Sequence, residues 1–162
     1  MLNVIVVGGG IAGLATAVSL RRAGHQVHIY ERSSFNNEIG AAIHMASNAS
    51  RALLAWGLDP GHARFVIAKS GLWAMGNSLE TFREADFTFY EEHFGAPWFL
   101  THRVDLHAEL KRLATGKGSG FSVTTHLNTE VVAYVRLLHY PSVISGFLTV
   151  CDYSARMTRL SH

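Results

Sequence analysis

The first thirty residues alternate between apolar runs and short glycine-rich breaks, and this pattern predicts three elements. Residues 4–7 are Val, Ile, Val and Val, a β-branched run typical of a strand that is buried on both faces. From Ile11 onward the apolar residues recur at helical spacing, and Gly24 marks the end of this helix. A second strand is expected at residues 26–30, where apolar and polar residues alternate. Together these elements have the length of a β-α-β crossover unit.

The patterns continue along the rest of the chain. Asn48 is a suitable N-cap for a helix that follows it, and Gly76-Asn77 is a typical turn between two strands. We expect helices at 49–56 and 105–114, a hairpin of strands 70–76 and 79–83, and strands at 121–125 and 130–135. Residues 40–43 are expected to form a loop.

Six aromatic residues gather between positions 87 and 99: Phe87, Phe89, Tyr90, Phe94, Trp98 and Phe99. Such a cluster either packs in a core or lines a pocket for an aromatic substrate. Because large aromatic side chains are most often buried for packing, the core interpretation is favoured.

Composition limits the class of protein. The chain has 162 residues, 48% of them apolar and 16% charged, which indicates a folded domain with a sizeable core and excludes a disordered chain. The net charge of +2, without a basic run, argues against a nucleic-acid partner. A single cysteine, Cys151, precludes an internal disulfide and fits a reducing compartment.

The apolar stretch at residues 4–20 superficially resembles a targeting segment. Only three residues, none of them basic, precede it, whereas a secretory signal begins with a basic region. The stretch is at the short limit for spanning a bilayer, and three consecutive glycines interrupt it. We therefore expect a cytoplasmic protein without a transmembrane segment.

Gly8, Gly10 and Gly13 form a G-x-G-x-x-G pattern at the junction of the first strand and helix. In this pattern the first glycine permits the tight turn, the second lets a pyrophosphate approach the backbone, and the third allows close packing of helix and strand. The helix then begins at Ile11 and Ala12, where backbone N–H groups and the helix dipole favour phosphate. The alternative is an ordinary tight turn with no ligand.

Glu31 ends the second strand, eighteen positions after Gly13. An acidic residue at this place accepts hydrogen bonds from a ribose 2′-hydroxyl and repels a 2′-phosphate. The combination of two strands, helix, glycines and Glu31 predicts a dinucleotide site. Arg32 has two interpretations, as a phosphate ligand or as a residue that borders the adenine.

Three segments together resemble the FAD-dependent aromatic-ring hydroxylases, the family of salicylate hydroxylase and p-hydroxybenzoate hydroxylase. They are GGGIAGLATAVSLRRAGHQVHIYER, which includes the glycine pattern, and the segments 39–58 and 101–110, in the order that the family has. The resemblance implies an α/β fold, a Rossmann-like FAD-binding domain with a mostly parallel sheet. It further implies that this domain is truncated and that part of a β-rich substrate domain is inserted.

The resemblance also implies domain limits and two further contacts with FAD. Residues 1–135 correspond to a partial FAD-binding domain, with the substrate-domain sheet starting at about 65–100. Ala42, in the expected loop, matches a usual glycine whose backbone touches the flavin. Arg103 matches an arginine that contacts FAD, and a guanidinium suits a pyrophosphate or a ribityl oxygen. Without the resemblance, a salt bridge from Arg103 to Asp105 or a solvated arginine is favoured.

The activity that the resemblance implies is that of a flavin monooxygenase, which uses FAD with NAD(P)H as reductant to hydroxylate an aromatic or similar small organic substrate. The residues of the chain identify no catalytic acid or base. The ten histidines form no metal-binding pattern, so no metal site is predicted. Oligomeric state is not readable from the sequence.

Two later motifs of the family, Asp-Gly and Gly-Asp, do not occur in this sequence. This leaves open a truncated, non-catalytic fragment that binds a dinucleotide, or another FAD-dependent oxidoreductase such as an amine oxidase or halogenase. Residues 136–162 do not read as the expected continuation. They either form one more pair of strands or, as the favoured hypothesis, are translated from an unspliced intron or a shifted frame.

Overall fold

The computed structural model describes residues 1–35, 40–116, 121, 123–136 and 146–152. The chain divides into two compact units, each described here by itself. One unit comprises Met1–Glu38 together with Ala114–His162, and the other comprises Ile39–Leu113.

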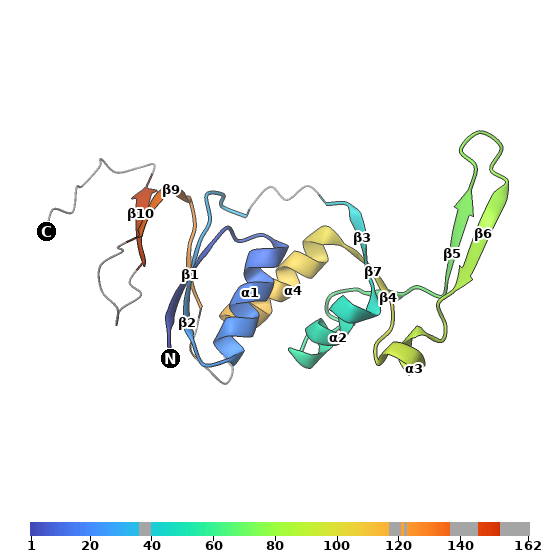
Figure 1. Cartoon of the computed structure of the whole chain (residues 1–162), viewed down its shortest axis with the longest axis horizontal. Coiled ribbons are helices and arrows are strands. Elements are labelled where there is room, and N and C mark those ends of the chain that lie inside the picture. The colour runs from blue at the N-terminus through green and yellow to red at the C-terminus, as the bar shows by residue number, and fades with distance from the viewer. Residues whose placement is uncertain (36–39, 117–120, 122, 137–145, 153–162) are drawn as a thin grey trace, which may run out of the picture. The chain divides into compact units, whose positions relative to one another are not determined.

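The first unit contains a parallel three-stranded sheet covered by a helix (Figure 1). Its elements are β1 (Asn3–Val7), α1 (Ile11–Arg22), β2 (Gln26–Tyr30) and β8 (Thr124–His126), with strand order β1-β2-β8. Val27 and Ile29 of β2 are fully buried, as are Leu14 and Ala17 of α1, which packs on the sheet. The predicted β-α-β unit and the α/β fold class are confirmed.

The prediction that residues 4–7 are buried on both faces is wrong. Ile5 is 39% exposed and Val7 is 59% exposed, whereas Val4 and Val6 are partly buried. No element of the described chain covers the second face of β1, and strand side chains alternate between the two faces. An apolar sequence run alone cannot reveal whether both faces are covered.

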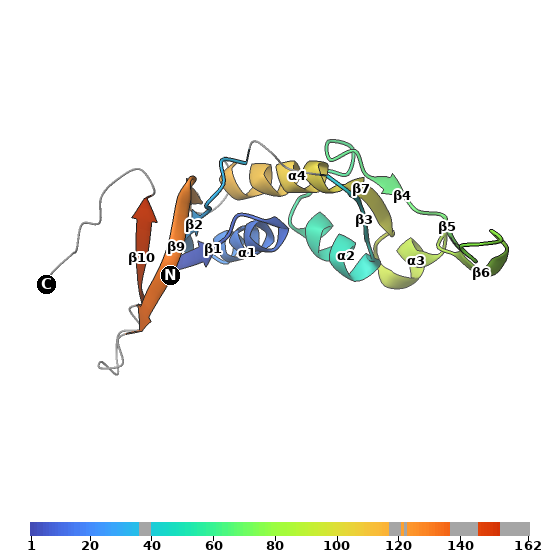
Figure 2. The ribbon, with the colours of Figure 1, turned by 90° about the horizontal axis from the view of Figure 1, so that it is seen from above.

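Strand β9 (Thr129–Arg136) pairs antiparallel with β10 (Gly146–Asp152), and the two lie side by side in Figure 2. The predicted strand at 130–135 thus falls within β9. The predicted strand at 121–125 overlaps β8, which begins at Thr124.

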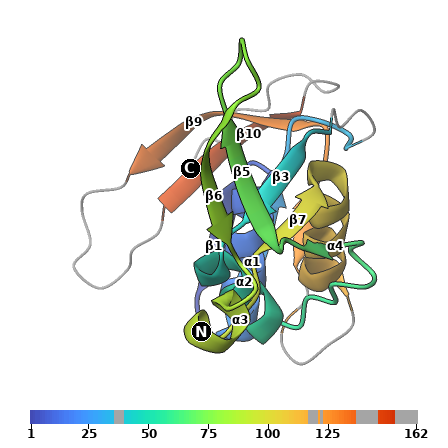
Figure 3. The same cartoon turned by 90° about the vertical axis from the view of Figure 1, so that its right-hand side faces the viewer.

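The second unit contains an antiparallel three-stranded sheet and a separate hairpin (Figure 3). The sheet has the order β3-β7-β4, and the hairpin joins β5 to β6, as predicted from the Gly76-Asn77 turn. The elements are β3 (Ala42–Met45), α2 (Ser47–Ala55), β4 (Val66–Ile67), β5 (Ser70–Ala74), β6 (Thr81–Asp86), α3 (Tyr90–Phe94), β7 (Phe99–His102) and α4 (Arg103–Thr115).

Three local predictions in this unit need correction. Helix α2 begins two residues earlier than expected, with Ala46 as its N-cap, so Asn48 lies in the first turn and bonds the neighbouring Ala49 N–H. The segment expected as a loop becomes a strand at Ala42 because it pairs with β7. In the aromatic cluster only Phe99 is buried, so the core interpretation holds for that residue alone.

Helix α4 is anchored by a buried carboxylate. The side chain of Glu109 is 1% exposed, and it accepts hydrogen bonds from Arg112 at 2.6 and 2.8 Å. It also accepts the Asp59 N–H at 3.2 Å and lies 2.7 Å from His62 Nδ1. The bonds from Arg112 lower the pKa of Glu109, burial opposes them, and Asp59 and His62 add to the lowering, so that the pKa falls to about 2 from its ordinary 4.5. The carboxylate thus ties the segment at 59–62 to α4.

Within the first unit, Arg21 of α1 is only 6% exposed and bonds the backbone at Ala114 and Gly116. Its guanidinium donates from Nη1 to the Ala114 carbonyl at 3.1 Å and from Nη2 to the Gly116 carbonyl at 2.6 Å. These carbonyls end a helix and have no further helical donors, so a cation is favourable there.

None of the described helices is long and apolar enough to cross a membrane.

Replacing Glu109 tests the buried carboxylate. Because its pKa is lowered in the folded state, Glu109 stabilises the protein above pH 4.5, and this stability is lost as the pH falls toward about 2. We expect Glu109→Gln to lower the free energy of unfolding at pH 7 by about 1–3 kcal/mol and to remove this part of the acid dependence. Urea unfolding between pH 7 and pH 3 measures both effects. Glu92→Gln, on exposed α3, is the control, and equal pH profiles for both variants would contradict the assignment.

Candidate functional site in the glycine turn

The turn between β1 and α1 uses its glycines in different ways. Gly8 has a φ of +95°, a backbone conformation that side chains rarely adopt. A Cβ on Gly13 would overlap the Gly8 carbonyl oxygen, so the third glycine permits the turn and helix to approach. Gly10 has a φ of −69°, and a Cβ there would meet nothing within 4 Å. Neither strain nor crowding within the described chain therefore requires a glycine at Gly10.

Glu31 lies beside this turn and is held by backbone N–H groups. Its Oε2 accepts the Gly9 N–H at 2.6 Å, and its Oε1 accepts the Ser33 N–H at 2.8 Å. Partial burial raises the pKa of Glu31, but these bonds, the Ser33 hydroxyl and the charge of Arg32 together lower it below 4.5. The carboxylate is thus ionised at neutral pH, and each oxygen keeps lone pairs for further donors.

The backbone fixes the end of β2 between β1 and the β8–β9 connection. Gly8 N–H donates to the Tyr30 carbonyl at 2.8 Å, and Glu31 N–H donates to the His126 carbonyl at 2.9 Å. Thr129 N–H in turn donates to the Glu31 carbonyl at 2.9 Å. Glu31 is therefore positioned from both sides by backbone hydrogen bonds.

A cavity of about 280 Å³ opens at this end of the sheet. Its lining combines the ends of β1 and β2, including Gly8, Glu31 and Arg32, with the start of β9. Residues Thr129, Glu130 and Val131 of β9 were not identified from the sequence as parts of the site. Their role depends on β8 pairing with β2 across almost 100 positions, for which a local pattern gives no signal.

A further residue that the sequence did not indicate is Phe35. Its ring occupies the space beside Gly9, where a Cβ would overlap it.

Backbone donors are available at the start of α1. The first N–H groups of a helix, here those of Ile11 and Ala12, have no acceptors within the helix, and Gly10 provides no side-chain cap. The turn therefore presents backbone donors and open space next to an ionised carboxylate.

The remaining two candidate residues lie in the second unit, at one end of the β3–β7 pair. Ala42 is exposed and faces His102 in the ladder, and the Arg103 N–H donates to the Ala41 carbonyl at 2.9 Å. Asp105, the expected salt-bridge partner of Arg103 if no cofactor is bound, pairs with Arg64. The structure thus brings Ala42 and Arg103 together within their own unit.

The predicted site residues accordingly form two groups. In the first unit, the glycine turn and the end of β2 bring together Gly8, Gly10, Ile11, Ala12, Gly13, Glu31 and Arg32. In the second unit, Ala42 and Arg103 are neighbours. Within the described parts of the chain, no three His, Cys, Asp or Glu side chains are grouped to hold a metal ion.

A parallel β-α-β unit with this glycine turn and acidic residue defines a dinucleotide-binding class of protein. Comparison with known families matches residues 3–114 to the family described as "FAD dependent oxidoreductase". The match covers more than half of the chain, so the protein belongs to this family.

Individual relatives confirm the resemblance to FAD-dependent aromatic hydroxylases. The chain is 45% identical over 153 residues to the FAD-dependent monooxygenase cfoG of Aspergillus candidus. This match covers 93% of the chain and 35% of the relative. It is 40% identical to hispidin-3-hydroxylase of Neonothopanus nambi, over 80% of this chain and 31% of the relative. Among solved structures, 2-methyl-3-hydroxypyridine-5-carboxylic acid oxygenase has a TM-score of 0.64 and 28% identity, over 81% of this chain and 32% of that chain.

The chain spans about a third of the length of these relatives. Because residues 1–135 are less than 93% of the 162 residues, the match to cfoG includes part of residues 136–162. The family resemblance therefore extends beyond Val135. The proposed domain limits and the origin of residues 136–162 stay predictions.

Alanine substitutions at Gly13 and Gly10 test whether the two glycines have different roles, Gly13 in packing of the turn and Gly10 in leaving open space beside it. We expect Gly13→Ala to lower the free energy of unfolding by about 2 kcal/mol or more, because the new methyl group overlaps the Gly8 carbonyl. Gly10→Ala should stay within about 1 kcal/mol of the parent, since the lost glycine N-cap and the reduced unfolded-state entropy oppose each other. Thermal and urea unfolding of both variants measure this difference. Equal destabilisation of the two would contradict the geometry of the turn.

Proposed function

We propose that this chain binds FAD and forms the FAD-binding N-terminal part of an NAD(P)H-dependent flavin monooxygenase that hydroxylates an aromatic or similar small organic substrate. The observation that carries the proposal is the empty space beside Gly10, next to the ionised carboxylate of Glu31. Membership of the FAD dependent oxidoreductase family supports FAD as the dinucleotide. The names of two relatives, a FAD-dependent monooxygenase and hispidin-3-hydroxylase, support monooxygenation. The name of the hydroxypyridine carboxylic acid oxygenase supports an aromatic substrate.

The residues of the glycine turn fit the pyrophosphate of FAD. In this proposal the N–H groups of Ile11 and Ala12 donate to phosphate oxygens, and the positive end of the α1 dipole favours their charge. Gly10 permits the close approach, whereas Gly8 and Gly13 give the turn its shape. Phosphate binding thus depends mainly on backbone groups, which need no particular side chains.

The adenosine half is assigned to the end of β2. Glu31 accepts hydrogen bonds from the ribose hydroxyls with the lone pairs that Gly9 and Ser33 leave available. Arg32 lies on the wall of the same cavity and borders the adenine or contacts a phosphate. The contacts of Ala42 and Arg103 with FAD stay predictions from the family resemblance.

FAD, when bound and reduced by NAD(P)H, supplies the redox chemistry of the reaction with oxygen. The chain itself binds and orients the cofactor, and no proton-transfer residue is assigned. A cytoplasmic setting fits the single cysteine. A second candidate is a non-catalytic FAD-binding piece, which the exposure of Ile5 and Val7 on the uncovered face of β1 favours.

FAD titration tests the assignment of the turn. We expect Gly10→Ala to weaken FAD binding at least about tenfold with little change in thermal stability, because its methyl group would meet the pyrophosphate. Glu31→Gln should weaken binding about tenfold through loss of charged acceptors for the ribose. Flavin absorbance and fluorescence give the dissociation constants.

The matched controls are Gly76→Ala in the β5–β6 turn, where a Cβ also meets nothing within 4 Å, and the exposed Glu84→Gln. Both should bind FAD like the parent chain. If Gly10→Ala binds FAD as tightly as Gly76→Ala does, the turn is not the pyrophosphate site. Bound FAD without NAD(P)H oxidation would support the second candidate.

The charge of Glu31 predicts discrimination between adenosine ligands. ADP should displace FAD, whereas ADP carrying a 2′-phosphate should compete at least about tenfold more weakly, because two negative groups would meet at Glu31. Glu31→Gln should reduce this difference. Competition titrations at constant ionic strength measure it, and equal competition in the parent would show that Glu31 does not lie at the ribose.

A further inference from the structure

Two histidines from distant parts of the chain meet on one face of the parallel sheet in the first unit. His28 lies in β2 and His126 lies in β8, 98 positions further along the chain. The Nδ1 atom of His28 lies 3.3 Å from the Nε2 atom of His126, and both side chains are partly buried. The spacing of histidines in the sequence could not indicate this pair, because it depends on the pairing of β8 with β2.

The register of the sheet explains why the two rings meet. Side chains alternate along β2, so the buried Val27 and Ile29 face α1 whereas His28 faces away from it. His126 is paired with Tyr30 in the ladder, and paired residues share a face of the sheet. His28 and His126 are therefore diagonal neighbours on the face opposite α1.

Stacking holds the orientation of these rings. The rings of Tyr30 and His126 are stacked with centroids 4.4 Å apart and planes within 10°. The planes of His28 and His126 differ by 19°, with centroids 5.6 Å apart. Two ligand groups whose orientation is already fixed lose little conformational freedom when an ion binds them.

The separation of the two nitrogens matches a tetrahedral zinc ion. With Zn–N bonds of about 2.0–2.1 Å at tetrahedral angles, two imidazole nitrogens on one ion lie about 3.3–3.4 Å apart. A hydrogen bond from an N–H group is commonly about 2.9–3.0 Å long, so the observed 3.3 Å is long for a direct bond between the rings. Tilting the rings turns both lone pairs toward one ion without changing this separation.

The chemistry of the pair also selects the ion. Imidazole nitrogen is a ligand for Zn²⁺, Cu²⁺ and Ni²⁺ rather than for Mg²⁺ or Ca²⁺. Neighbouring nitrogens on a square-planar Cu²⁺ or Ni²⁺ ion lie only about 2.8–2.9 Å apart, so the observed separation favours Zn²⁺. The neutral pair holds one proton between its rings, and this proton moves to the outer nitrogen of its own ring when the ion binds.

We infer that His28 and His126 form a site for one Zn²⁺ ion, which ties β8 to β2. Water occupies the two other positions of the ion, and the partial exposure of both side chains permits this. Glu31 N–H donates to the His126 carbonyl at 2.9 Å, so the ion holds the backbone that leads to the glycine turn. The site has only two protein ligands and is therefore open, unlike a structural zinc site with four.

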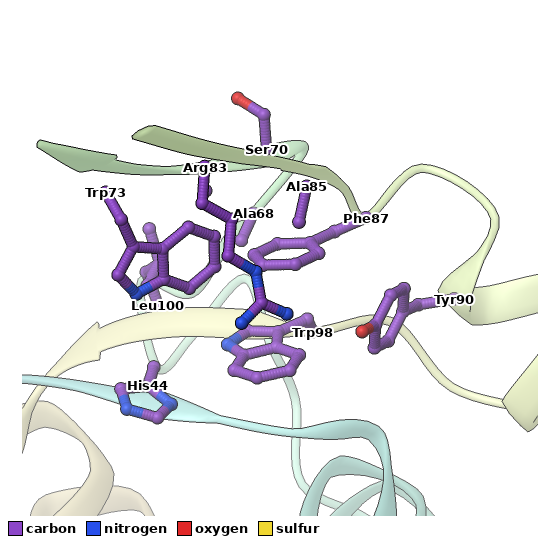
Figure 4. Close-up of a pocket in the computed structure, with 11 residues that line it drawn as sticks. His44, Ala68, Ser70, Trp73, Arg83, Ala85, Phe87, Tyr90, Trp98 and Leu100 are labelled. Carbon is purple, nitrogen blue, oxygen red and sulfur yellow. The ribbon is translucent and has the colours of Figure 1, made fainter. Parts of the chain in front are cut away.

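His44 offers a matched control. It also lies in a strand, and its ring stacks on the aromatic ring of Trp98 with centroids 5.4 Å apart. Figure 4 shows His44 near Trp98 on the wall of a cavity of about 440 Å³ in the second unit. The residues that line this cavity include no second histidine, so His44 offers a single imidazole there.

Zinc titration of the metal-free whole chain tests the site. We expect one ion per chain, and long-range ¹H–¹⁵N spectra should show ligation at Nδ1 of His28 and Nε2 of His126. Zn²⁺ at about ten times its dissociation constant should raise the melting temperature by about 3–6 °C, because it binds the folded pairing of β2 and β8. His28→Asn and His126→Asn should each weaken zinc binding at least about tenfold, because the second imidazole binds intramolecularly.

The double variant should bind Zn²⁺ no more weakly than either single variant, and His44→Asn should bind it like the parent. Without zinc, both site variants should melt within a few degrees of the parent, because asparagine keeps a hydrogen-bonding side chain. If a variant does not fold, the nitrogen shifts of the parent decide, since they need no substitution. No zinc binding by the parent, ligation only at other histidines, or equal effects of His28→Asn and His44→Asn would each overturn the assignment.

Discussion

The hydrogen bond between the Glu31 carboxylate and the Gly9 N–H is the interaction on which the candidate dinucleotide site depends. At 2.6 Å it joins the end of β2 to the glycine turn of β1 and α1. The same carboxylate takes the Ser33 N–H, so the glycine turn and the segment after β2 are held by one side chain. An ionised acceptor makes these bonds stronger than neutral ones, which explains how a short turn without side chains keeps a defined shape.

In the second unit, another ionised carboxylate, that of Glu109, fixes α4 to the neighbouring backbone. Glu109 is buried but has three kinds of donors, so its charge is compensated rather than isolated. Arg21 has the reverse role: its positive guanidinium donates to the carbonyls of Ala114 and Gly116 at the C-terminal end of α4, where the partial charge is negative. The bonds of Glu109 to the segment at 59–62 and those of Arg21 join segments that are far apart in the sequence, whereas the pair with Arg112 lies within one helix. The buried charges of Glu109 and Arg21 thus act as structural ties, each within its own unit.

The sequence predicted what depends on neighbouring residues. The β-α-β unit, the glycine turn and the Gly76-Asn77 hairpin follow from period, turn chemistry and spacing within about thirty residues. The predictions that were wrong or missing depend on contacts between residues far apart in the sequence. Val7 looks like a core residue but lies on an uncovered face. Phe87 is only partly buried and stacks on Trp98, eleven positions further along the chain. Thr129 lines the cavity at the ends of β1 and β2 because β8, which precedes it, pairs with β2. This pairing joins residues almost 100 positions apart, and no local sequence pattern indicates it.

Charge selects the ligand at the glycine turn through close contacts. In the proposed site, the carboxylate of Glu31 accepts hydrogen bonds from ribose hydroxyls and repels an additional phosphate. The net charge of +2 is too small to give the chain a strong field, so this discrimination depends on contacts within a few ångströms. A neutral amide at the same position would keep an acceptor for the hydroxyls but would not repel the phosphate. The charge of Glu31 is therefore the feature on which the discrimination depends.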